Sequence, residues 1–69
     1  MFESSWTVIP SYGRDYKSKA EVMAAWNDGK DFQIPGGPHI NKQDFDASNM
    51  TDIHIRYAKQ TKIIILKRK

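Results

Sequence analysis

The sequence contains no cysteine, and it has only four glycines and three prolines among its 69 residues. Disulfide bonds and thiolate metal sites are therefore excluded. No apolar run approaches the roughly 18 residues that a membrane-spanning helix needs. The residues from Met1 to Ser5 lack the basic start and the apolar core of a signal peptide. We therefore expect a soluble, cytoplasmic protein that has no association with a membrane.

The chain is long enough for one domain, which we place at residues 1–69. A domain of this size buries only ~60% of the surface of its unfolded chain, so its core is small and its stability is low. Without disulfides, the reinforcement most open to such a chain is association with further copies of itself. We therefore expect a homo-oligomer.

Acidic residues are missing from the last part of the chain. Residues 1–29 hold three bases and four acids, residues 30–52 hold two and four, and residues 53–69 hold six and none. Such asymmetry is typical of proteins that bind nucleic acid or another polyanion. The alternative is that these charges keep a terminal strand soluble and protect its edge from pairing with other strands.

The first half of the chain predicts a strand, a helix and a second strand. Residues 5–9 are aromatic and β-branched and end at a proline, with Trp6 and Val8 on one face of the expected strand. Ser18 and Glu21 have the spacing of a capping box, which predicts a helix from Lys19 to about Gly29. In this motif the Glu21 carboxylate should accept from the Ser18 amide. Residues 30–34 alternate polar and apolar and predict a short strand.

The second half predicts a long loop followed by a hairpin. Residues 39–52 are polar, with Ile40, Phe45 and Met50 as isolated apolar anchors. A short helical turn from Asn41 or Lys42 to Phe45 is compatible with this pattern. Residues 51–57 alternate cleanly, and 61–66 include four consecutive apolar residues. Residues 58–60 contain no glycine, which favours a type I turn with a bulge.

Together these elements predict an α+β fold in the order β-α-β-β-β. We expect a small, mainly antiparallel sheet of three to four strands with one helix packed on it. The apolar face of the helix, with Val22, Met23 and Trp26, should cover the sheet. The apolar run at 63–66 should be covered on both faces, or it should leave one face for a second subunit.

Several motifs of catalysis and metal binding can be set aside. Asn41-Lys42-Gln43-Asp44 fits the guanine-reading motif of GTPases, but the sequence has no phosphate-binding loop ending in Gly-Lys-Ser or Gly-Lys-Thr. We expect Asn41 and Asp44 to bond the backbone of a local turn instead. His39 and His54 lack the spacing of zinc ligands. We predict no metal, no cofactor and no enzymatic activity.

The segment before the predicted helix is the best candidate for ligand binding. Tyr12, Arg14, Tyr16 and Lys17 lie within six residues, just ahead of a helix amino terminus that favours anions. Arginine can hold a phosphate with two hydrogen bonds, and tyrosine can stack on a base. The alternative is that Arg14 pairs with an acid and the tyrosines close the edge of the core. Further candidates are the polar or basic residues Lys42, His54, Arg56, Lys67, Arg68 and Lys69.

The spacing of several motifs resembles a group of small uncharacterised bacteriophage and prophage proteins. The resemblance rests on YGRDYKS at 12–18, Trp26, GKDF at 29–32, INKQD at 40–44 and IRY at 55–57. It implies a phage accessory protein in a bacterial cytoplasm, acting in counter-defence or regulation. Proteins of this kind commonly act by binding host proteins, nucleic acid or nucleotides.

These observations lead to a non-enzymatic protein that binds a phosphate-bearing ligand, either a nucleic acid or a nucleotide signal. An inhibitor or adaptor that binds a host protein is the second hypothesis, through an exposed sheet edge or the polar 39–52 loop. A minor structural component of the phage is the third.

Overall fold

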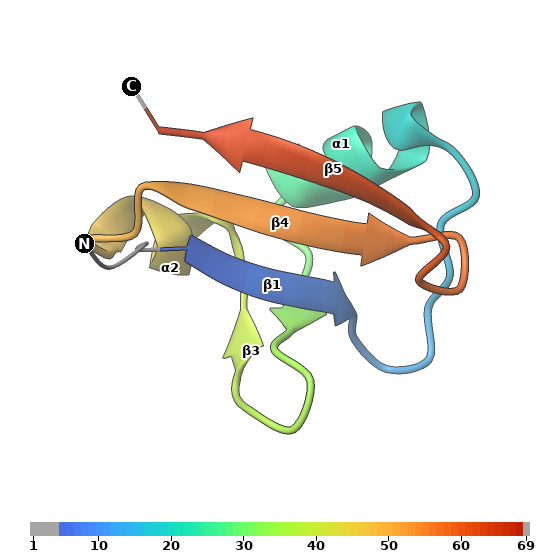
Figure 1. Ribbon diagram of the computed structural model, residues 1–69, viewed down its shortest axis with the longest axis horizontal. Coiled ribbons are helices and arrows are strands. Elements are labelled where there is room, and N and C mark those ends of the chain that lie inside the picture. Colours follow the sequence, from blue (N-terminus) through green and yellow to red (C-terminus); the bar gives the residue numbers. More distant parts are fainter. Residues whose placement is uncertain (1–4, 69) are drawn as a thin grey trace.

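The computed structural model describes residues 5–68, which form a five-stranded mixed sheet with two helices on one of its faces (Figure 1). The strand order across the sheet is β3-β2-β1-β4-β5. The α+β fold and the mainly antiparallel pairing are confirmed, with one strand and one helix more than predicted. The elements in chain order are β1 (Ser5–Pro10), α1 (Lys19–Asn27), β2 (Phe32–Gln33), β3 (His39–Ile40), α2 (Lys42–Ala47), β4 (Asp52–Tyr57) and β5 (Lys62–Lys67).

The centre of the sheet is the parallel pair β1 and β4, whose register places Val8 beside Ile55. Alternation along each strand sends these two side chains to the helix side, where both are fully buried. Ile64 of β5 pairs with Ile55 and is buried on the same side. The face expected for Val8 in residues 5–9 and the alternation expected along 51–57 are therefore confirmed. No helix among the described residues is long and apolar enough to cross a bilayer.

The helix α1 begins where the sequence predicts, because the Ser18 hydroxyl accepts from the Glu21 amide at 3.2 Å. The Glu21 carboxylate, however, accepts from the amide of Lys17 at 2.9 Å, one residue earlier than the capping box predicts. The helix ends at Asn27, and Gly29 takes the expected left-handed conformation with φ +80°. Val22 and Trp26 are buried under it, as predicted, whereas Met23 is only half-buried and packs at the edge of the core.

The segment predicted as a loop contains regular structure. β3 adds an edge strand to β2, and α2 follows at once with a complete capping box between Asn41 and Asp44. The Asp44 amide donates to the Asn41 side chain at 3.0 Å, and the Asn41 amide donates to the Asp44 carboxylate at 3.1 Å. The expected backbone bonding of these two residues is thus confirmed. It starts a helix whose Phe45 is buried against the ring of Trp26.

The hairpin turn between β4 and β5 differs from the prediction. Ala58, Lys59 and Gln60 all have positive φ, at 52°, 55° and 67°, whereas a type I turn begins with right-handed residues. Left-handed turns match the right-handed twist of paired strands, but they are usually marked by glycine or asparagine. Here the Tyr16 carbonyl and the Asp15 carboxylate accept from the Ala58 and Lys59 amides, so the turn forms without either residue type and has no local sequence signal.

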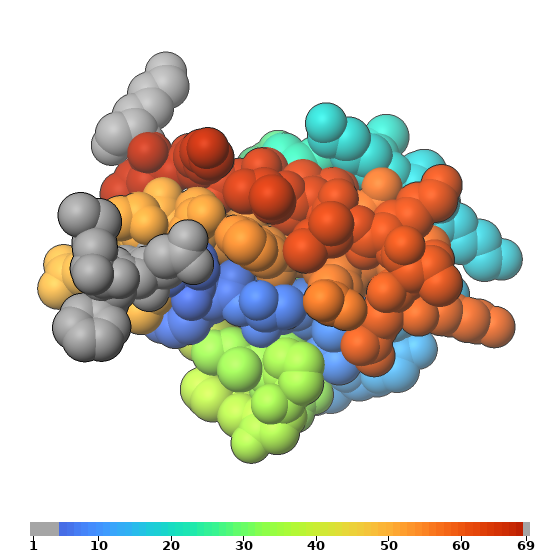
Figure 2. Space-filling view, in the orientation of Figure 1, coloured from blue at the N-terminus to red at the C-terminus, as the bar shows by residue number. Residues whose placement is uncertain are grey.

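The side of the sheet opposite the helices is open. Figure 2 views the molecule from this side, where β1, β4 and β5 are seen without a covering layer. Ile63 and Ile65 of the edge strand β5 lie on this face and are 47% and 50% exposed. Among residues 5–68, only one face of the apolar run is therefore buried, so these residues do not cover it on both faces. Whether a second subunit covers the other face stays a prediction.

Candidate functional site

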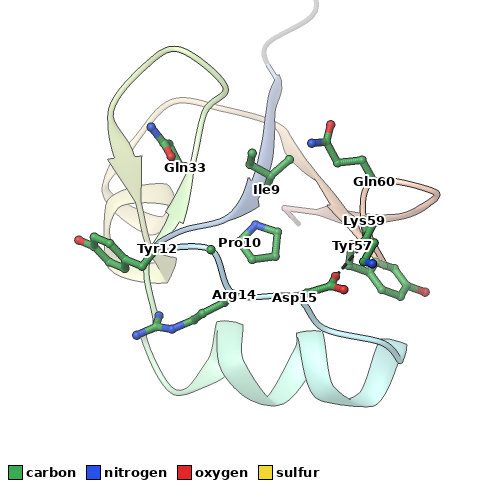
Figure 3. Close-up of a pocket in the computed structure, with 10 residues that line it drawn as sticks. Ile9, Pro10, Tyr12, Arg14, Asp15, Gln33, Tyr57, Lys59 and Gln60 are labelled. Carbon is green, nitrogen blue, oxygen red and sulfur yellow. Dashed lines mark hydrogen bonds between the residues drawn. The ribbon is translucent and has the colours of Figure 1, made fainter.

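A pocket of about 470 Å³ lies where the parallel strands β1 and β4 end (Figure 3). The carboxyl ends of parallel strands are a common position for ligand sites, and this volume falls within the range of small-molecule pockets. Three segments contribute to it: the end of β1 with the loop that follows, β2, and the β4–β5 turn. The lining residues are Ile9, Pro10, Tyr12, Gly13, Arg14, Asp15, Gln33, Tyr57, Lys59 and Gln60.

The loop after β1 forms one wall and carries Arg14. Tyr12 and Gly13 have φ of 61° and 72°, so the chain reverses here, and the Arg14 amide closes the turn on the Ser11 carbonyl at 3.2 Å. The Tyr12 ring stacks on His39 with centroids 4.9 Å apart, and its hydroxyl donates to Asp31 at 3.2 Å. This fixed ring supports the Arg14 guanidinium, which lies 5.5 Å from the ring centroid.

The β4–β5 turn forms the opposite wall and is tied to the same loop. The Lys59 amide donates to the Asp15 carboxylate at 3.0 Å, and the Ala58 amide donates to the Tyr16 carbonyl at 2.8 Å. The first of these bonds joins residues that are 44 apart in the chain. Together the two bonds hold both walls at a fixed separation. The bond from Lys59 also uses one oxygen of the Asp15 carboxylate, which lines the pocket.

Ile9 and Pro10 lie at the centre of the pocket, with Gln33 and Gln60 on either side of Ile9 (Figure 3). Arg14 and Tyr12 extend to one side, and Asp15 points toward Lys59. The site thus combines an apolar surface, two amide side chains that can both donate and accept, and two cationic residues. This combination suits a ligand with a flat apolar part, a polar edge and an anionic group.

Most carboxylates of the described residues have a partner within the fold, whereas several of the cationic side chains have none. The acidic side chains mostly accept hydrogen bonds or pair within the fold, as Asp15, Glu21, Asp28, Asp31, Asp44 and Asp52 do. By contrast, Arg14, Arg56, Lys59 and Lys62 form no ion pair with any residue of 5–68. The positive charge near the pocket is therefore free to meet a ligand.

The predicted binding residues fall into several places. Tyr12 and Arg14 line the pocket together. Tyr16 turns inward instead and packs its ring against Phe32 at 5.8 Å, which is the role in closing the core that the sequence left open. Lys17 is exposed but is not part of the lining.

The remaining predicted residues lie away from this pocket. Lys42 is the first residue of α2, and Lys67 is exposed at the end of β5. His54 and Arg56 lie on the open face of β4, where the His54 ring contacts Asp52 at 3.0 Å. Lys69 is outside the described residues. Their part in binding stays a prediction.

Arg68 has a structural role in the fold. Its guanidinium donates to the Met50 carbonyl at 2.8 Å, to the Asp46 carbonyl at 3.2 Å and to the Phe45 carbonyl. It also lies 4.4 Å from the centroid of the Phe45 ring. Because carbonyls at the end of a helix lack partners within it, this side chain closes the carboxyl end of α2.

The sequence reasoning missed Gln33, Lys59 and Gln60. None of them lies in a recognisable motif, and they approach Arg14 only when the sheet assembles. The positive charge of Lys59 within the turn was visible, but its position beside the loop after β1 was not.

One serine–histidine contact has the geometry of a nucleophile and its base. The Ser11 hydroxyl lies 2.9 Å from His39 Nδ1. Ser11 is fully buried, however, so no substrate can reach its oxygen. The contact instead fastens the loop after β1 to β3. No group of three potential metal ligands occurs among residues 5–68.

Comparison of the chain with protein-family models, curated proteins and solved structures gave no match. The resemblance to phage proteins therefore stays a prediction.

Proposed function

We propose that this protein is a non-enzymatic binding protein for a nucleotide-class ligand, held in the pocket at the ends of β1 and β4. The observation that carries the proposal is an unpaired arginine, Arg14, fixed on the Tyr12 ring beside an apolar floor. Arginine in this state can donate two hydrogen bonds to a phosphate without first leaving another partner. A cation supported by an aromatic ring also loses less freedom when it binds.

The base of the ligand would rest on Ile9 and Pro10, between the amides of Gln33 and Gln60. These amides can read the polar edge of a base, since each offers a donor and an acceptor. The phosphate would then lie toward Arg14. Lys59 supplies a second charge from the opposite wall.

Native mass spectrometry of the 8.0 kDa protein with nucleosides and nucleoside 5′-monophosphates tests this proposal, because it resolves which base is bound. We expect the monophosphates to bind and the nucleosides to bind at least tenfold more weakly, as expected for the loss of a charge-assisted contact. Arg14→Gln should weaken monophosphate binding by about tenfold.

Lys17→Gln is the matched control, since it removes the same charge from the same exposed segment outside the lining. It should change affinity by less than about twofold. Equal losses in both variants would mean that general charge, and not the pocket, attracts the ligand. Binding that ignores the phosphate would also refute the proposal.

The resemblance to phage proteins supports a setting for this activity. A small cytoplasmic accessory protein of a phage could sequester a nucleotide signal of its bacterial host, as counter-defence or regulation. Phosphate recognition by a non-catalytic pocket would suffice for sequestration.

A second candidate function is protein binding through β5, as an adaptor, an inhibitor or a homo-oligomer. It is favoured by the half-exposed Ile63 and Ile65 on a strand at the edge of the sheet. Edge strands can pair with a strand of another chain. Light scattering reports self-association, and Ile65→Lys should abolish it if β5 is the interface.

A further inference from the structure

The open face of the sheet carries a row of four side chains that leads out of the pocket. Gln33 pairs with Ile9, and Arg56 pairs with Ile63. Val8 and Ile55 are register partners in the parallel pair, so the next residues, Ile9 and Arg56, are neighbours on the opposite face. The row therefore crosses β2, β1, β4 and β5 without a break.

A second, smaller hollow of about 180 Å³ lies at the far end of this row. It is lined by Arg56, Gln60, Thr61, Lys62 and Ile63. Gln60 belongs to both hollows, so the two adjoin at this side chain. A single ligand can thus extend from one hollow into the other.

The second hollow shares three residue types with the first: an isoleucine, an arginine and a lysine. The first pairs Ile9 with Arg14, and the second pairs Ile63 with Arg56. Lys59 and Lys62 add one further cationic residue to each. Unlike the first hollow, which includes Asp15, the second has no acidic residue in its lining, and the Arg56 guanidinium makes no ion pair with any residue of 5–68. An apolar surface beside an arginine, occurring twice, matches a ligand in which a base and a phosphate also occur twice.

We propose that the second hollow is a subsite for a further phosphate, and that the ligand is a short single-stranded oligonucleotide of at least two nucleotides. The inference rests on the proposed function of the first pocket. Unpaired bases offer the flat apolar surfaces that Ile9 and Ile63 can contact, whereas a duplex keeps these surfaces stacked inside. Two linked contacts also bind more tightly than either alone, because the second contact forms within the same complex.

The test compares the four nucleoside 5′-monophosphates with the mixture of 5′-phosphorylated dinucleotides, by native mass spectrometry of the whole chain. Wild-type protein should bind a dinucleotide at least tenfold more tightly than a monophosphate, the ratio expected for one added charge-assisted contact. Arg56→Gln should remove about tenfold of the dinucleotide affinity and change the monophosphate affinity less than twofold. Lys62→Gln should act in the same direction with a smaller effect, since lysine binds phosphate as a point charge.

Lys19→Gln is the matched control, because Lys19 is an exposed cation at the start of α1 and lines neither hollow. It should leave both affinities within about twofold. Circular dichroism confirms that each variant folds.

The possible results separate the two proposals. Equal wild-type affinities for monophosphates and dinucleotides overturn the subsite and leave the proposed function intact, provided that Arg14→Gln still weakens both. Equal losses in Arg56→Gln and Lys19→Gln also overturn the subsite. Failure of both ligand sets to bind overturns the proposed function and the subsite with it.

Discussion

Replacing Gln60 with glycine should stabilise the fold while it weakens ligand binding. Gln60 is the third of three consecutive left-handed residues, with φ 67°. Its side chain is exposed and forms no hydrogen bond with another described residue, so the substitution removes no internal contact of that kind. The same side chain lines both hollows, which makes it the position where stability and binding are most directly opposed.

The magnitude follows from two opposing effects. A residue with a Cβ pays about 1–2 kcal/mol to adopt the left-handed conformation, and glycine avoids this cost. Glycine also gives the unfolded chain more freedom, which costs the folded state about 0.5–1 kcal/mol. The net gain should be about 0.5–1 kcal/mol. For a domain of this size, that gain raises the Tm by about 2–8 °C.

Thermal unfolding followed by circular dichroism measures this shift, with Lys62→Gly as the matched control. Lys62 is exposed in the same hairpin, but its φ is not positive. Glycine there should therefore destabilise by about 0.5–1 kcal/mol. A Gln60→Gly protein that melts below the wild type would show that the turn is unstrained and that our account of it is wrong. Unchanged nucleotide binding in this variant would separately remove Gln60 from the site.

Substitutions at three further positions test how the rest of the fold is held together. Arg68→Ala should cost about 2–3 kcal/mol in urea unfolding, because it removes the charged donors of the Met50 and Asp46 carbonyls; a loss below about 0.5 kcal/mol would contradict this role. Phe32→Ala removes a fully buried ring and should cost about 3–5 kcal/mol, enough to leave much of this small domain unfolded at 25 °C by NMR. A native-like spectrum would be the unexpected result. Asn41→Ala should cost about 1 kcal/mol and Asn41→Ser much less, since serine also caps helices; equal losses would argue against the capping box.

The parts of the fold that were predicted correctly depend on local patterns. The start of α1 follows from Ser18 and Glu21, three residues apart, and the inward face of β4 follows from strict alternation along 53–57. Each signal lies within a few residues and does not depend on the rest of the chain. The confirmed elements are therefore those whose cause is local.

The parts that were missed depend on distant segments. β3 has two residues and exists because it pairs with β2, so no periodic pattern can mark it. The helical turn expected from Asn41 or Lys42 is confirmed as α2, but its full length was missed, because α2 buries one large side chain, Phe45, which is too little for an amphipathic pattern. The parallel register of β1 and β4 joins strands more than 40 residues apart, and strand pairing over such distances cannot be deduced from local preference.

Only part of the candidate site could be predicted, again because only local patterns can be recognised in the sequence. Tyr12 and Arg14 were recognisable, because a dense group of aromatic and basic residues is itself a local signal. Gln33 and Gln60 were not, since an amide side chain in a loop or short strand has no distinctive context. The charge of Arg68 makes it a candidate for ligand binding, but its neighbours in the sequence do not indicate that its side chain reaches the end of α2.

The arginines of the chain have two different roles in the structure: one stabilises the fold, and the others are free to bind a ligand. Arg68 contributes to the basic end of the chain, yet its donors are directed at backbone carbonyls, so its charge serves stability. Arg14 and Arg56 have no partner of this kind among residues 5–68, whereas Asp15 fixes the Lys59 amide and hence one wall of the pocket. Neutralising either free arginine should therefore leave the stability of the fold unchanged and weaken only ligand binding. Neutralising Asp15 should affect both, because that carboxylate determines where the cationic residues of the two walls stand.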